Sequence, residues 1–89
     1  MTNPIHLPDG TYNLLPGHSM VFDLGPGQDT VSVTNNNAHG VGSFMLSINH
    51  SPSATHTLNP GTSFNINAHA GDHFHIDNNG AVALEVDIA

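Results

Sequence analysis

Residues 58–79 read LNPGTSFNINAHAGDHFHIDNN, and this stretch has a counterpart earlier in the chain. Residues 14–36 read LLPGHSMVFDLGPGQDTVSVTNN, and they align with it at an offset of 44 before the central gap and 43 after it. The identical pairs are Leu14/Leu58, Pro16/Pro60, Gly17/Gly61, Ser19/Ser63, Asp29/Asp72, Asn35/Asn78 and Asn36/Asn79. A repeat of this kind predicts that one structural unit occurs twice in the chain.

Apolar residues also match between the two stretches, and they alternate with polar ones, which is the pattern of half-buried strands. The matched pairs are Met20/Phe64, Phe22/Ile66, Val31/Phe74 and Val33/Ile76. No ten-residue stretch has the apolar period of a helix. We therefore predict strands over residues 11–15, 19–24, 29–34, 43–49, 55–58, 63–67, 73–78 and 81–88.

About eight short strands with Pro-Gly and Asn-Asn-Gly turns indicate an all-β fold. We expect a small antiparallel β-sandwich, of jelly-roll or Greek-key topology, built from two similar four-strand halves at 11–50 and 55–89. Residues 11–89 would form a single domain. Residues 1–10 contain Pro4 and Pro8, which disfavour a helix, and we predict an extended N-terminal arm there.

The charge balance excludes several kinds of partner. The 89 residues include seven acidic side chains, eight His, no Lys or Arg and no Cys, giving a net charge of −7 with His neutral. Nucleic acid and anionic membrane surfaces are excluded because both are bound through Lys and Arg. No apolar run is long enough to insert into a membrane, and we expect a soluble chain; its location is open, with the extracellular space or a virion or cell surface as the alternatives considered. The net charge should change steeply as the His residues titrate.

One candidate metal site lies in the second half. His73, His75 and Asp77 alternate on one predicted strand, so their side chains share a face and could hold a divalent metal, with His69 nearby. His56 and Glu85 could join from neighbouring strands. The competing interpretation is that these side chains are the solvent face of a strand whose other face is core.

Residues 71–77, with His73-x-His75, resemble the first motif of the cupin family, which implies metal binding by the two His side chains in a β-sandwich. The family places a glutamate a few residues after the second His, where this chain has Asn78 and Asn79. That departure removes one of the ligands the resemblance implies.

A second hypothesis is a lectin-like module that binds glycans. The loops around Asn35, Asn36, Asn78 and Asn79 could bind sugar hydroxyls directly or through calcium, which takes oxygen ligands. The alternative is turn chemistry, because Asn tolerates left-handed backbone geometry.

Our first hypothesis is a non-enzymatic subunit that self-associates into an oligomer, filament, appendage or capsid decoration. The outward faces of the predicted strands carry Thr, Asn, Ser and His rather than the charged residues that keep sheet edges apart. Association would use the sheet faces and the N-terminal arm. We predict no catalytic residue, because the chain has no Gly-x-Ser-x-Gly motif and no Cys, and because without Lys or Arg an anionic transition state would be stabilised by backbone donors alone. No cofactor is predicted apart from the metal alternative above.

Overall fold

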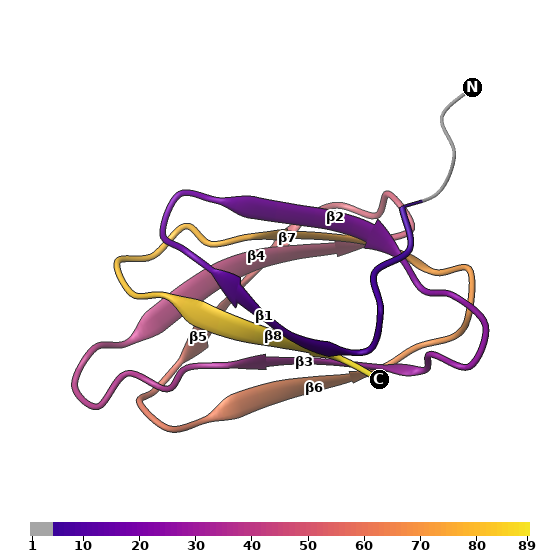
Figure 1. Ribbon diagram of the computed structural model, residues 1–89. Helices are drawn as coiled ribbons and strands as arrows, with labels where there is room; N and C mark the ends of the chain where they lie inside the picture. The colour runs from indigo at the N-terminus through magenta and orange to yellow at the C-terminus, as the bar shows by residue number, and fades with distance from the viewer. Residues whose placement is uncertain (1–4) are drawn as a thin grey trace.

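A computed structural model describes residues 5–89, and within them every regular element is a strand (Figure 1). The strands are β1 (Gly10–Leu14), β2 (Ser19–Asp23), β3 (Thr30–Thr34), β4 (Gly42–Ile48), β5 (Ala54–Leu58), β6 (Ser63–Asn67), β7 (His73–Asp77) and β8 (Leu84–Ile88). Over the described range there is accordingly no helix that could cross a membrane.

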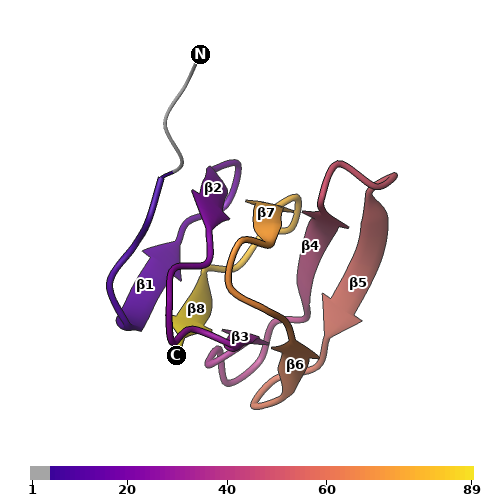
Figure 2. The same cartoon turned by 90° about the vertical axis from the view of Figure 1, so that its right-hand side faces the viewer.

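The eight strands form two four-stranded sheets with all neighbours antiparallel. The first sheet has the order β1-β8-β3-β6 and the second the order β2-β7-β4-β5. Figure 2 shows the two sheets facing each other as layers. The first strand pairs with the last, the second with the seventh, and so on inward, which is the strand order of a jelly roll. The predicted β-sandwich is confirmed, and of the two topologies considered the chain has this one.

The internal repeat relates one sheet to the other. The repeat makes β1 equivalent to β5, β2 to β6, β3 to β7 and β4 to β8. When each strand of the first sheet is replaced by its equivalent, the order β1-β8-β3-β6 becomes β5-β4-β7-β2, which is the second sheet read backwards. Each half therefore contributes two strands to each sheet. Because the sheets interleave strands from both halves, neither half has a complete sheet of its own.

The core lies between the sheets and is made by the repeated apolar positions. Phe22, Val31, Val33, Phe74 and Ile76 are fully buried. The rings of Phe22 and Phe74 stack with centroids 5.3 Å apart, across the β2–β7 pair. Burial of each such side chain stabilises the fold by about 1.5–3 kcal/mol, and this explains why the alternation was kept in both halves.

The predicted strand over 81–88 begins three residues later than expected, at Leu84. The reason is the side chain of Asn78, which donates a hydrogen bond to the backbone carbonyl of Val82 at 2.9 Å and holds that segment as a loop. The bounds of the other predicted strands agree with the observed ones to within one residue at each end.

The Pro-Gly pairs form matching turns in the two halves. His18 N–H donates to Leu15 C=O at 3.0 Å, and Thr62 N–H donates to Asn59 C=O at 3.1 Å. The glycines take φ values of 79° at Gly17 and 77° at Gly61, which only glycine adopts without strain. The two identities therefore preserve one turn geometry.

The described part of the predicted N-terminal arm, residues 5–9, lies on its own sandwich (Figure 2), and residues 1–4 are outside the described range. Asp23 N–H donates to Ile5 C=O at 2.8 Å, and His6 forms a parallel bridge with Asp23 at the end of β2. Leu7 packs against the core, and its carbonyl accepts from the Gln28 side chain at 2.7 Å. Residues 5–9 thus cover the side of the sandwich where β1 and β2 are the edges.

Candidate functional site

The predicted metal residues His73, His75 and Asp77 lie along β7 on the outer face of the second sheet, each half-buried. His75 Nε2 lies 3.0 Å from a carboxylate oxygen of Asp77, which also accepts from the Ser19 hydroxyl. His73 Nδ1 instead lies 3.0 Å from Asp23 of β2. The two imidazoles therefore point to different carboxylates.

His50 stacks on His73 with ring centroids 4.6 Å apart, so a second imidazole lies at this end of β7. Across residues 5–89, no three His, Asp or Glu side chains come together in an arrangement that could hold a metal ion. The outward direction of the β7 side chains was correctly anticipated, and the metal itself remains a hypothesis.

His69 is exposed in the turn that precedes β7, and its backbone N–H rather than its ring forms a hydrogen bond with Asp72. Its N–H donates to a carboxylate oxygen of Asp72 at 2.9 Å, while the Asn49 side chain donates to the other oxygen at 3.0 Å. The Asn49 side-chain hydrogen bond, followed by that of the His69 backbone, lowers the pKa of Asp72 below its ordinary range. Asp72 therefore joins this turn to the loop after β4.

The four predicted Asn residues divide into two kinds. Asn35 and Asn78 are buried, with 0% and 2% of their surface exposed, and their side chains bond to the backbone. Asn36 and Asn79 follow them and are exposed. The amides of Asn35 and Asn78 are therefore engaged in the fold, and Asn36 and Asn79 are the members of the set that can reach a ligand.

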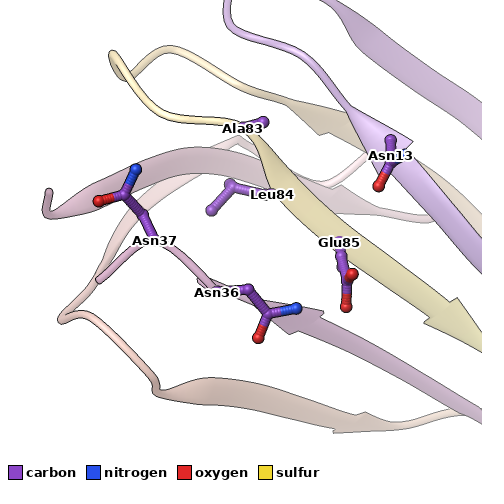
Figure 3. Close-up of a pocket in the computed structure, with 6 residues that line it drawn as sticks. All are labelled: Asn13, Asn36, Asn37, Ala83, Leu84 and Glu85. Carbon is purple, nitrogen blue, oxygen red and sulfur yellow. The ribbon is translucent and has the colours of Figure 1, made fainter. Parts of the chain in front are cut away.

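Asn36 lines an open depression of about 240 Å³ at the end of the first sheet. The lining residues are Asn13, Asn36, Asn37, Ala83, Leu84 and Glu85. Asn13 and Glu85 face each other across the β1–β8 pair, while Asn36 and Asn37 come from the segment after β3 (Figure 3). We call this depression the Glu85 pocket.

The polar groups of the Glu85 pocket are available to a ligand. Among the side-chain hydrogen bonds within residues 5–89, none involves Asn13, Asn36 or Glu85. Asn37 Oδ1 accepts from the backbone N–H groups of His39 and Gly40, at 2.9 and 2.6 Å, which shapes the loop beside the pocket. The pocket thus presents one carboxylate and a group of amides beside the exposed methyl group of Ala83.

Sequence reasoning included Asn36 but did not connect it with Asn13 or place Glu85 beside it. The signal was present in the repeat, since the first half has Ser43 at the position equivalent to Glu85 of the second half. Asn13 pairs with Glu85 as its repeat partner Thr57 pairs with Ser43. A charged residue at one of two equivalent outward positions marks a difference between the halves.

No protein-family model matches this chain, and the search of curated proteins finds no match.

Proposed function

We propose that the protein is a non-enzymatic structural subunit that associates with further copies of itself through the edge strand β5. Antiparallel pairing of β5 with β5 of a second copy would join the second sheets of the two copies by main-chain hydrogen bonds. An oligomer or a filament, as an appendage or a capsid decoration, would each be built on such a contact.

The observation that carries this proposal is the unprotected edge of β5. Residues 54–58 read ATHTL, with no Asp, Glu, Lys, Arg or Pro, and among the strands of residues 5–89 only β4 pairs with β5. Natural sheet edges are usually protected by charges, prolines, bulges or a covering segment. Thr55 and Thr57 are exposed, so small hydroxyl side chains flank the free edge.

The opposite side of the sandwich supports the proposal by contrast. There the edge strands are β1 and β2, and residues 5–9 lie over them. The Tyr12 hydroxyl donates to the Pro8 carbonyl at 2.5 Å, and Gln28 donates to Asp9 at 2.9 Å, so the covering is held by side chains as well as by backbone. No segment of the described chain covers the edge strands β5 and β6 in this way.

The side chains at the uncovered side are aromatic. The His56 ring lies 4.4 Å from the Phe64 ring and 5.3 Å from the Phe44 ring, centroid to centroid. His56 and Phe64 are half-buried, whereas their repeat partners Tyr12 and Met20 lie on the side that the arm covers. A second copy at β5 would complete the burial of His56 and Phe64, adding an apolar contribution to the edge pairing.

A structural role is also favoured by the chemistry of the chain. The sequence has no Lys or Arg to stabilise an anionic transition state and no Cys to act as a thiolate nucleophile. The carboxylates Asp23, Asp72 and Asp77 each bond to neighbouring groups of the fold.

Sedimentation velocity of the full chain at increasing concentration tests the proposal, with a lysine placed on the edge strand. Thr55→Lys should abolish association, because each copy would then carry a lysine on the pairing edge, and charged side chains there oppose the approach of a second strand. The matched control is Thr11→Lys, at the repeat-equivalent position of β1, which should associate like the unmodified protein. A monomer at all concentrations, at both about pH 7.5 and about pH 5, would overturn the proposal, as would equal loss of association in both variants.

A further inference from the structure

The repeat creates two equivalent positions, one in each sheet, where a strand residue lies beside the loop that follows the neighbouring strand. A side-chain hydrogen bond joins strand and loop at only one of these two positions. Asn35 donates to Gly40 C=O and Asn78 to Val82 C=O, so the two loops are anchored alike and Ser43 is the counterpart of Glu85. In the second sheet, the Ser43 hydroxyl donates to Asn79 at 2.6 Å and fills the space between strand and loop.

In the first sheet the same space is the Glu85 pocket. Asn36 is the counterpart of Asn79, but Glu85 stands where Ser43 would be, and two acceptor oxygens of a carboxylate replace one hydroxyl. Asn36 and Glu85 make no hydrogen bond with each other. The scaffold can therefore close this position with a Ser–Asn bond, and in the first sheet it leaves the position open.

The lining groups define what can bind. An amide side chain both donates and accepts, and so does a hydroxyl group, whereas an ammonium group only donates. Asn13 and Asn36 would each find complementary partners on a hydroxyl-rich molecule, and the Glu85 carboxylate can accept two O–H groups from adjacent carbons. With an ammonium ligand, the N–H donors of both amides would have no acceptor.

Two further observations narrow the ligand class. The exposed methyl group of Ala83 gives one wall a small apolar surface, suited to the C–H face of a sugar ring. The chain contains no Lys or Arg, so an anionic ligand would meet the Glu85 carboxylate without a compensating cation. We propose that the Glu85 pocket binds a vicinal diol of a neutral carbohydrate, with Glu85 and Asn36 as the main hydrogen-bonding groups.

This site goes beyond the proposed assembly and is independent of it. The pocket lies at the end of the first sheet, between β1, β8 and the loop after β3, whereas the proposed contact uses β5 of the second sheet (Figure 3). An assembly of many copies would nevertheless display many such pockets and raise the avidity for a surface glycan.

The test is a titration of the isotope-labelled full chain, followed by ¹H–¹⁵N NMR, with the neutral monosaccharides glucose, galactose, mannose, fucose and N-acetylglucosamine. At least one of them should shift the amide signals of Asn36, Asn37 and Glu85. Glu85→Gln should weaken that binding by roughly tenfold, the size expected for hydrogen bonds to a charged group. Asn36→Ala should also weaken it.

Two matched variants serve as controls. Asp87→Asn removes a carboxylate from the same face of β8 but outside the pocket, and Asn79→Ala alters the repeat-equivalent position in the second sheet; both should bind as the unmodified chain does. The proposal is overturned if no neutral sugar shifts these signals, if Glu85→Gln binds equally well, or if glucuronate binds as tightly as glucose. Shifts produced by calcium or by methylammonium alone, without a response to sugars, would also overturn it.

Discussion

Asn35 and Asn78 make the same hydrogen bonds in the two halves of the molecule. Asn35 Nδ2 donates to Leu58 C=O at 2.9 Å, and Asn78 Nδ2 donates to Leu14 C=O at 2.9 Å. Leu14 and Leu58 are themselves repeat partners, so each Asn binds the end of the strand that belongs to the other half. The two bonds thereby tie the halves together at one end of the sandwich.

These bonds predict a large loss of stability when the amide donor is removed. Asn35→Asp and Asn78→Asp keep the shape of the side chain but set a buried carboxylate against backbone carbonyls. Each should lower the free energy of unfolding by at least about 2 kcal/mol, measured by urea denaturation near neutral pH. Asn36→Asp and Asn79→Asp are the controls, and these exposed changes should stay within about 0.5 kcal/mol. Equal effects at buried and exposed positions would contradict the assignment.

The two Pro-Gly turns predict matching effects of alanine. Gly17 and Gly61 both have positive φ, and a Cβ at either position would meet no neighbouring atom. The cost of Gly17→Ala or Gly61→Ala should therefore come from backbone strain alone, about 1–2 kcal/mol each. Thermal unfolding of the single and double variants checks this, and the double variant should show the sum. A cost near zero would mean that the turns change conformation freely.

The lowered pKa of Asp72 predicts a pH-dependent contribution to stability. A carboxyl whose pKa is lower in the folded chain than in the unfolded chain stabilises the fold above its unfolded pKa, and this stabilisation is lost as pH falls through the folded pKa. Asp72→Asn should be less stable than the unmodified chain at neutral pH, and the difference should shrink below about pH 4. Urea denaturation across this range measures it. A difference that is constant with pH would argue against a role for the charge.

The charge balance predicts that self-association responds to salt. With His neutral, each copy carries a net charge of −7. Because like charges on two copies repel, association near neutral pH should strengthen as the salt concentration rises and screens this repulsion. Sedimentation measurements at low and high salt concentration decide the point, and weaker association at the higher salt concentration would be the contrary result.

Much of the fold could be predicted from the sequence because it depends on local alternation. Residues such as Phe22, Val31, Phe74 and Ile76 lie in the core where the pattern placed them, and the Pro-Gly pairs make the expected turns. The repeat also extends further than residues 14–36, since His6/His50, Pro8/Pro52 and Thr11/Thr55 match at the same offset. The two equivalent His residues nevertheless differ in structure. His6 lies in the N-terminal segment and bridges to Asp23 of β2, whereas His50 lies in the connection between the paired strands β4 and β5.

The candidate site could be predicted only in part. Asn36 was singled out as a turn residue with a polar side chain, but an Asn-Asn pair looks the same whether a member is buried or exposed. Asn35 faces inward because its carbonyl partner, Leu58, arrives from the other half of the chain. Glu85 lies beside Asn13, which is distant in sequence, because β1 and β8 are neighbours.

The amino-acid sequence alone establishes that the chain forms strands in two similar halves, since side-chain alternation and turn chemistry act over a few residues and are visible without partners. The order of the strands, the inward direction of Asn35 and Asn78, and the free edge of β5 depend on pairings between distant segments. Many pairings satisfy the same alternation, and only packing of all eight strands around one shared core selects among them.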